Sequence, residues 1–304
     1  MERFEIYILG CGSALPTTKH FLSSQVINLR DKLYMIDCGE GAQLQFRAMK
    51  QNFQKLSRIF ISHLHGDHCF GLPGLISTLG LLGRTADLHI HAHYDAEKLF
   101  APLFRYFCKE LPYKIYFQAF NPEKSELIFE DRSLKVTTIP LKHRVPTAGF
   151  LFEEKPSSPH IIREMIDFYR VPVSQIRAIK EGAPFITGEG ETIPSMVFTR
   201  PAETPRKYAY CSDTAYYEKI IPIIADVNTL YHEATFSNAD CARAKETFHS
   251  SAAQAASIAK AANAGRLVIG HFSARYPDER ILLNEALEIF PKTQLAYEKM
   301  ILKV

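Results

Sequence analysis

The sequence predicts an α/β fold in which mixed β-sheets are covered by helices. Short β-rich runs alternate along the chain with segments of helical periodicity, and this alternation is typical of sheets flanked by helices. Two early apolar runs meet at Asp31 and Lys32, where a β-hairpin is expected. With 304 residues, 46% of them hydrophobic, the chain is long enough to bury a large core.

Four of the β-rich runs lead toward side chains that can bind metal ions. The runs and the residues that follow them are 58–62 with His63, 134–141 with His143, 207–211 with Asp213, and 266–270 with His271. We expect these strands to deliver the four side chains to one edge. The expected helices lie between the strands, over 72–82, 95–108, 251–262 and 278–290.

Composition indicates an ordinary globular protein and gives little information about its partners. The formal net charge is +3, from 36 basic and 33 acidic residues, so no strong field of the kind typical of nucleic-acid binders is present. The six cysteines form no Cys-x-x-Cys pair and are interpreted as reduced thiols, with Cys69 as a packing residue. The chain begins on a strand-like run without a secretory pattern and has no apolar run of membrane-spanning length, so we expect a cytoplasmic enzyme.

The segment from 153 to 206 has a different pattern. Short helical pieces, one of them expected to open at Ser158 and Pro159, are interrupted by prolines and glycines. The segment carries seven Lys or Arg and eight Asp or Glu residues, so its net charge is close to zero. We predict an insertion that protrudes from a single domain of residues 1–304.

The strongest chemical signal is the run from His63 to His68, which reads His-Leu-His-Gly-Asp-His. His63 and His65 leave a strand two residues apart and point the same way, so one metal ion can take both, while the next turn directs Asp67 and His68 toward a second ion. Imidazole and carboxylate ligands favour zinc, with manganese or iron as alternatives, over magnesium. The run therefore predicts a two-metal site.

Four side chains cannot complete two metal sites, and His143, Asp213 and His271 are the candidates for the remaining ligands. A carboxylate such as Asp213 can bridge two cations about 3.5 to 4 Å apart, and water held between them is a hydroxide near neutral pH. This chemistry predicts a hydrolase. The alternating histidines from 89 to 93 are interpreted instead as structural residues of a strand.

Five further stretches carry recognisable motifs. They are the loop 9–17 (LGCGSALPT), the strand and turn 34–41 (YMIDCGEG), and the stretches 232–235 (HEAT), 249–256 (HSSAAQAA) and 270–276 (GHFSARY). Together with the His and Asp set, they resemble the ribonuclease Z family of the metallo-β-lactamase superfamily over nearly the whole chain. The resemblance implies an αββα sandwich of two mixed β-sheets flanked by helices, with a protruding flexible arm.

The resemblance implies a zinc-dependent endoribonuclease that removes the 3′ trailer from precursor tRNA by metal-hydroxide attack, leaving a tRNA 3′-hydroxyl. It also implies a homodimer. Two zinc ions would be held, the first by His63, His65 and His143 and the second by Asp67, His68 and His271, with Asp213 bridging them. Asp67 would also serve as general base, and His249, held by Glu233, would protonate the leaving ribose oxygen, because imidazole has a pKa near the working pH.

Contacts with the RNA are expected from the arm and from two loops. Gly182 and Pro184 resemble the family's Gly-Pro turn with one residue intervening, and the insertion lies where the family carries the arm that grips tRNA. Lys19 lies in a loop that departs from the family's CCA-sensing sequence. Arg275 follows the last metal motif and could meet a phosphate or pair with a carboxylate. The neutral arm departs from a basic RNA clamp, so a structural lid or a dimer element is its alternative.

Two other function classes remain open at the level of sequence. One is a hydrolase or phosphodiesterase of the same fold that acts on a small ester or a cyclic nucleotide. The other is a metal-binding RNA adaptor without catalytic activity. The complete ligand set and His249 argue against the adaptor, and the 232–235 loop and the arm-like insertion argue against the small-molecule hydrolase.

Overall fold

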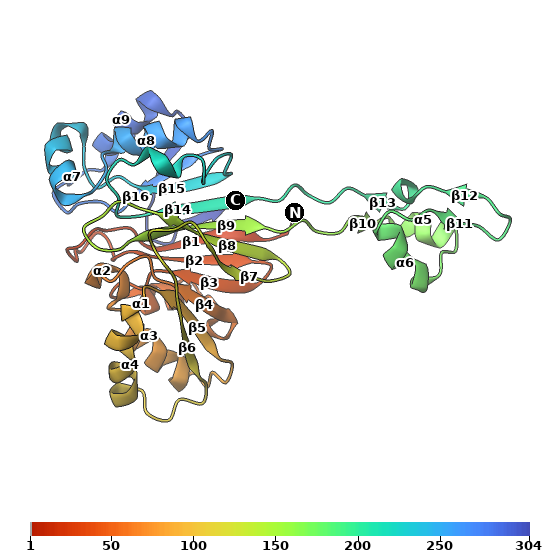
Figure 1. The fold of residues 1–304 in the computed structure, drawn as a ribbon, viewed down its shortest axis with the longest axis horizontal. Coiled ribbons are helices and arrows are strands. Elements are labelled where there is room, and N and C mark those ends of the chain that lie inside the picture. Colours follow the sequence, from red (N-terminus) through yellow and green to blue (C-terminus); the bar gives the residue numbers. More distant parts are fainter. Residues whose placement is uncertain (1) are drawn as a thin grey trace. The chain divides into compact units, whose positions relative to one another are not determined.

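The computed structural model describes residues 2–304, which form two compact units. The body comprises residues 2–153 and 206–304, and the insertion comprises residues 154–205. The body is an αββα sandwich in which two seven-stranded mixed sheets lie between two groups of helices (Figure 1). The predicted α/β architecture is therefore confirmed.

The first sheet is built mainly from the N-terminal third of the chain. Its strands, in spatial order, are β18 (Ile301–Lys303), β1 (Phe4–Gly10), β2 (Ser24–Leu29), β3 (Lys32–Ile36), β4 (Leu56–Phe60), β5 (Leu88–Ala92) and β6 (Ile115–Ala119). The expected hairpin at Asp31 joins β2 and β3 in antiparallel register. From β3 to β6 the strands are parallel, because helices cross between them.

The second sheet continues from the middle of the chain to its C-terminal part. Its strands, in spatial order, are β17 (Thr293–Leu295), β16 (Leu267–Gly270), β15 (Thr229–Glu233), β14 (Lys207–Cys211), β9 (Ala148–Glu154), β8 (Leu134–Pro140) and β7 (Leu127–Glu130). The strands from β14 to β17 are parallel, and β9 pairs with β14 in antiparallel register.

Side-chain alternation explains why the first sheet is covered on both faces. Along β1, Phe4, Ile6 and Ile8 face the core between the sheets, whereas Tyr7 and Leu9 face the outer core, as the two-residue period of a strand requires. The outer core is covered by α1 (Ala42–Ala48), α3 (Leu72–Leu81) and α4 (Asp95–Phe107).

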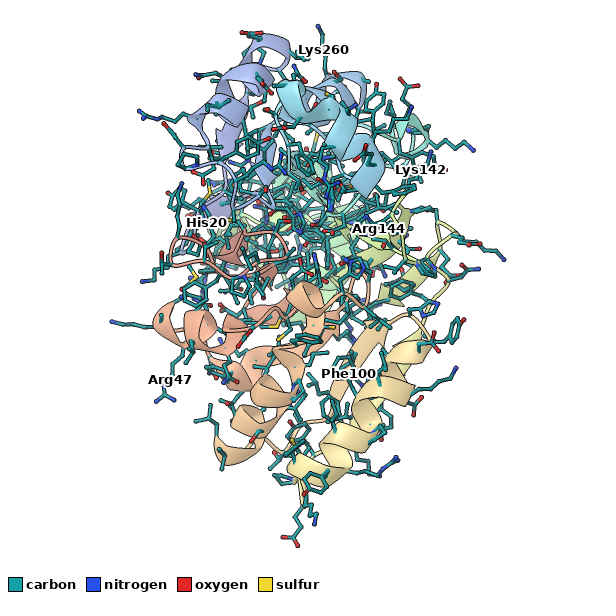
Figure 2. All side chains as sticks on the ribbon, turned by 90° about the vertical axis from the view of Figure 1, so that its left-hand side faces the viewer. His20, Arg47, Phe100, Lys142, Arg144 and Lys260 are labelled. Carbon is teal, nitrogen blue, oxygen red and sulfur yellow. The ribbon has the colours of Figure 1, made fainter. Side chains whose placement is uncertain are left out.

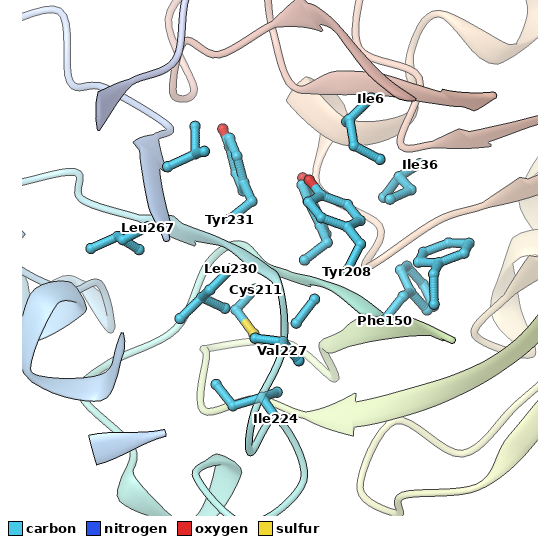
Figure 3. Close-up of a cluster of buried hydrophobic side chains, with 14 of the residues drawn as sticks. Ile6, Ile36, Phe150, Tyr208, Cys211, Ile224, Val227, Leu230, Tyr231 and Leu267 are labelled. Carbon is cyan, nitrogen blue, oxygen red and sulfur yellow. The ribbon is translucent and has the colours of Figure 1, made fainter. Parts of the chain in front are cut away.

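The core between the sheets continues to the helices of the second half. Figure 3 shows Ile6 and Ile36 of the first sheet near Tyr208, with Phe150 and Tyr231 of the second sheet in the same cluster. The helices α8 (Ala252–Ala261) and α9 (Arg280–Ile289) pack against this cluster and cover the second sheet, preceded by the short α7 (Cys241–Thr247). Ser251, where the sequence predicts this helix to begin, is the N-cap of α8 and forms a capping box with Gln254.

The insertion has a small core of its own. It contains α5 (Arg163–Phe168), α6 (Val173–Lys180) and two two-stranded sheets, β10 (His160–Ile161) with β13 (Thr199–Arg200) and β11 (Phe185–Ile186) with β12 (Thr192–Ile193). Its buried side chains include Ile179 and Phe198. The expected helix start at Ser158 and Pro159 is wrong, because the next two residues pair as β10 with β13 and the helix begins only at Arg163.

None of the helices within residues 2–304 combines the length and apolar character that crossing a membrane would require.

Candidate metal centre and catalytic site

The predicted ligands come together, although their strands belong to two sheets. His63 follows β4 of the first sheet, whereas Asp213 and His271 follow β14 and β16 of the second. The expectation of one common edge is therefore replaced by a site between two sheets, since local sequence does not show which sheet a strand joins. Asp213 and His271 have φ angles of 56° and 60°, a left-handed conformation that costs about 1 to 3 kcal/mol each and is typical of functional sites.

The first donor set consists of His63, His65, His143 and Asp213, whose ligand atoms all lie within 4.8 Å of one another. His65 Nδ1 lies 3.0 Å from His63 Nε2 and 3.4 Å from His143 Nε2. Three imidazole nitrogens that face one another around a carboxylate form the donor arrangement that a transition-metal ion prefers. This set can hold one metal ion.

The second donor set consists of Asp67, His68 and His271, and Asp213 lies between the two sets. One oxygen of Asp213, Oδ1, lies 3.1 Å from Nε2 of both His68 and His271. The other, Oδ2, lies 3.6 Å from His63 Nε2 and 3.7 Å from His143 Nε2. Asp213 thus presents one oxygen to each set, which is the geometry of a carboxylate that bridges two cations.

The outer nitrogens of four of the five histidines in the donor sets are held in place by other groups. His68 Nδ1 lies 2.7 Å from Asp37 Oδ2, and His63 Nδ1 lies 3.0 Å from Ser62 Oγ. His143 Nδ1 lies 3.0 Å from the Phe248 carbonyl oxygen, and His271 Nδ1 lies 3.0 Å from Thr235 Oγ1. Such partners fix the tautomer and orientation of metal-ligating histidines. Four of the five ring systems are thus held with Nε2 directed inward for ligation, whereas His65 turns its Nδ1 toward His63 and His143.

Asp37 is fully buried and organises the ligand loop rather than joining the donor sets. Its carboxylate contacts His68, accepts hydrogen bonds from the Ser62 amide at 2.7 Å and hydroxyl at 2.9 Å, and accepts another from the Tyr210 hydroxyl at 2.8 Å. These contacts give Asp37 a supporting role at the ligand loop. The nearby Gly39 is required because a Cβ there would lie 2.5 Å from the Asp67 carbonyl oxygen.

The predicted acid and its partner form a hydrogen-bonded chain beside the donor sets. His249 Nδ1 lies 2.8 Å from Glu233 Oε1, and Glu233 also accepts hydrogen bonds from the Thr214 amide and the Thr235 hydroxyl. Burial lowers the pKa of His249, but the charge and hydrogen bond of Glu233 outweigh this effect and raise it to about 9. His249 is therefore a cation at neutral pH, with Nε2 left to reach a substrate.

Arg144 is a positive charge near the site that sequence reasoning missed. Its side chain is exposed and makes no ion pair with any of residues 2–304. Burial is the main cause that lowers the pKa of His65, and the charge of Arg144 contributes to the same shift. Arg144 and Lys142 both line a surface cavity of about 480 Å³ that also includes His143. The only sequence signal was the position of Arg144 directly after a ligand.

The four residues predicted to contact RNA have different surroundings. Gly182 and Pro184 follow α6 in the insertion, where Gly182 has a φ of 101° and open space around it. Lys19 forms an ion pair with Glu279. Arg275 pairs with Asp240 at 3.0 Å, which is the carboxylate alternative considered from sequence.

The residues interpreted as structural have structural contacts. The Cys69 thiol donates to the His65 carbonyl oxygen at 3.1 Å and thereby braces the ligand loop. His91 is buried, stacks on Phe60 with ring centroids 4.7 Å apart, and lies 3.1 Å from Arg58 Nη1. Among the described residues, the 89–93 histidines belong to none of the donor groups.

Comparison with known sequences identifies relatives over the entire chain. Ribonuclease Z of Bacteroides thetaiotaomicron is 61% identical over 304 residues, covering 100% of this chain and 96% of the relative. Ribonuclease Z of Parabacteroides distasonis is 60% identical over 304 residues, with 100% of both chains covered. Residues 4–156 also match the family model described as anti-Pycsar protein Apyc1, a range that includes His63 to His143 and ends before Asp213.

Comparison with solved structures supports the same fold. Human tRNase Z, short form, matches with a TM-score of 0.72 at 24% identity, covering 99% of each chain. The metallo-β-lactamase fold protein YhfI from Bacillus subtilis matches with a TM-score of 0.69 at 18% identity, covering 100% of each chain. The fold is that of the metallo-β-lactamases. The full-length identity of about 60% shows that the chain belongs to the ribonuclease Z family.

Proposed function

We propose that this endoribonuclease removes the 3′ trailer from precursor tRNA by hydrolysis of one phosphodiester, leaving a 3′-hydroxyl on the tRNA. The observation that carries the proposal is the conjunction of two donor sets bridged by Asp213 with an adjacent His249–Glu233 pair. The substrate is inferred from the ribonuclease Z relatives. We further infer that the enzyme is soluble, works in the cytoplasm and forms a homodimer.

The donor sets fit two divalent ions, with zinc favoured by their imidazole and carboxylate groups. Bound there, such ions would lower the pKa of an attacking water and neutralise charge on the phosphoryl oxygens. Asp67 is positioned to orient that water and receive its proton, because its carboxylate faces the donor sets while Oδ2 is held by the Ala14 amide at 2.8 Å. His249, the partner of Glu233, lies beside the donor sets, because its candidate ligand atom is within 4.8 Å of those of Asp213 and His271.

His249 then acts on the leaving group. Its Nδ1 is held by Glu233, so the proton on Nε2 is free to pass to the ribose 3′ oxygen as the bond to phosphorus breaks. Glu233 stays ionised, because the charge of His249 and its hydrogen bond lower its pKa against the opposing effect of burial. The pair can therefore protonate the leaving oxygen without a change in the protonation of Glu233.

A cleavage assay tests the proposed function directly. The metal-loaded protein is incubated with a precursor tRNA that carries a 3′ trailer, and in parallel with a small thioester and a cyclic nucleotide. We expect one cut at the 3′ end of the tRNA, after the discriminator nucleotide. Intact precursor together with rapid hydrolysis of either small substrate would replace the proposal with the small-molecule hydrolase.

Arg144 is expected to bind a phosphate of the RNA. In Figure 2, Arg144 lies in the middle of the view, whereas Arg47 lies near the edge of the body on α1. We expect Arg144→Ala to raise KM for precursor tRNA and to reduce the slope of log(kcat/KM) against log[salt] by about 0.7 to 0.9, the effect of one phosphate contact. Arg47→Ala is the matched control and should leave the slope unchanged; equal slopes for both variants would exclude the contact.

Removal of the insertion should separate substrate binding from chemistry. Residues 154–205 form a compact unit with its own core, so their replacement by a short glycine and serine linker should leave the body folded. We expect normal hydrolysis of bis(p-nitrophenyl) phosphate but a higher KM for precursor tRNA, because the arm is proposed to bind RNA away from the cut. A parallel loss of both activities would assign the insertion a structural role.

A further inference from the structure

A third group of metal-binding side chains lies outside the two donor sets. It comprises Cys11, His20 and Glu298, whose candidate ligand atoms lie within 4.8 Å of one another. Cys11 Sγ lies 3.4 Å from His20 Nδ1 and 3.6 Å from Glu298 Oε1, and His20 Nδ1 lies 3.0 Å from Glu298 Oε2. Cys11 is fully buried, and the side chains of His20 and Glu298 are only 12% and 15% exposed.

The two separations from the sulfur match those between ligands of one tetrahedral zinc ion, and the nitrogen–oxygen separation of 3.0 Å is slightly shorter. Zinc bonds of about 2.0 to 2.3 Å to nitrogen, oxygen and sulfur place neighbouring ligand atoms about 3.3 to 3.6 Å apart. A thiolate, an imidazole and a carboxylate also form a donor combination that favours zinc over magnesium or calcium. The group therefore has suitable distances and suitable ligand chemistry.

The surroundings of His20 strengthen the assignment. Its Nδ1 faces Cys11 and Glu298, whereas its Nε2 lies 3.1 Å from Glu279 Oε1. A carboxylate on the far nitrogen is the usual partner of a metal-ligating histidine, because it fixes the ring and raises its basicity. Glu279 is in turn paired with Lys19, so its charge is compensated without the metal.

We propose that Cys11, His20 and Glu298 bind a third metal ion, of the zinc type, separate from the two-metal centre. Burial and the charge of Glu298 hold the pKa of the Cys11 thiol well above its usual range, so the ion must displace the thiol proton. The sulfur–hydrogen bond of Cys11 and the Nδ1–hydrogen bond of His20 break, sulfur–metal and nitrogen–metal bonds form, and both protons pass to solvent without oxidation or reduction. The ion is bound as a thiolate complex with a charge balance close to neutral.

The third ion would anchor the loop that supports Asp67. His20, on the left of Figure 2, lies in the loop between β1 and β2, and Glu298 precedes β18 at the other end of the chain. Phe21 donates its amide to Glu298 at 2.9 Å, and Ala14 of the same loop donates to Asp67 Oδ2 at 2.8 Å. The ion would therefore have a positioning role, because it connects the C-terminal part of the chain to the loop that holds the Asp67 carboxylate.

Cobalt substitution provides the test, because the other two donor sets contain no sulfur. The full-length protein is stripped of metal and titrated with Co²⁺, and bound metal is measured by elemental analysis. We expect a thiolate-to-cobalt charge-transfer band in the near-ultraviolet and about three metal ions per chain, the count implied by three donor groups. Cys11→Ala and Glu298→Gln should lower the count to about two, with the band abolished by Cys11→Ala.

Cys241→Ser is the matched control, since Cys241 lies in none of the donor groups of the described residues, and it should keep the band. A wild-type protein that shows no thiolate band would overturn the proposal and leave His20 as a cation between Glu298 and Glu279. A thiolate band with about one ion per chain would instead support the third site while contradicting the two-metal centre. The two proposals therefore fail in distinguishable ways.

Discussion

Asp67→Ala should abolish hydrolysis of precursor tRNA while RNA binding persists. Burial raises the pKa of Asp67, but His68 and His271 outweigh this effect and hold it well below its usual range, so the carboxylate is ionised at the working pH. Its removal takes away a member of the second donor set and the group proposed to orient the water. We expect kcat to fall by about 100- to 10,000-fold, the range typical of a positioned base.

The measurement combines single-turnover cleavage with a filter-binding assay on the same precursor. The Kd of the variant should remain within about threefold of wild type, a difference of less than 1 kcal/mol. Asp95→Ala, in the first turn of α4, serves as the control and should retain full activity. An Asp67→Ala protein that cleaves at the wild-type rate would show that another group positions the water.

Glu233→Gln should move the alkaline limb of the pH–rate profile toward lower pH. A general acid works in its protonated form, which is present below its pKa and lost as the pH rises through it. In the wild type, Glu233 raises the pKa of His249 to about 9, so kcat should hold to about that pH. Without the charge, burial lowers this pKa, and a value at or below about 6.5 would reduce kcat at pH 8 by about 30-fold or more.

The profile of kcat, measured between pH 5 and pH 10 with saturating RNA, decides this prediction because kcat reports groups in the enzyme–substrate complex. His249→Ala should abolish the limb altogether, and Glu97→Gln on the surface of α4 should leave it unchanged. If the limb stays at the same pH in Glu233→Gln, Glu233 does not set the pKa of His249.

Much of the site could be predicted because its ligands lie in short, chemically distinctive runs. His63 to His68 are contiguous, His271 follows an apolar strand directly, and Asp213 lies two positions after the end of one. The main helices could be placed in the same way, since their periodicity is local and Ser251 marks a helix start. Local patterns were therefore sufficient for the side chains that the structure brings together and for most of the elements that carry them.

Features that depend on distant parts of the chain could not be predicted. Asp37 and His68 are 31 positions apart, and nothing in either neighbourhood specifies the partner. The two-residue strands β10 and β13 form only because they pair with each other across the insertion. Local sequence does not show this pairing, and a helix was therefore expected at Ser158. The Cys11 group depends likewise on Glu298, 287 positions away.

The position of the broken bond tests the central claim most directly. Precursor tRNA is cleaved by the metal-loaded protein in ¹⁸O-labelled water, and both products are analysed by mass spectrometry. Attack by water with protonation of the ribose 3′ oxygen by His249 predicts an unlabelled 3′-hydroxyl on the tRNA and one ¹⁸O atom in the 5′-phosphate of the trailer. A 2′,3′-cyclic phosphate on the tRNA, with an unlabelled 5′-hydroxyl on the trailer, would contradict it.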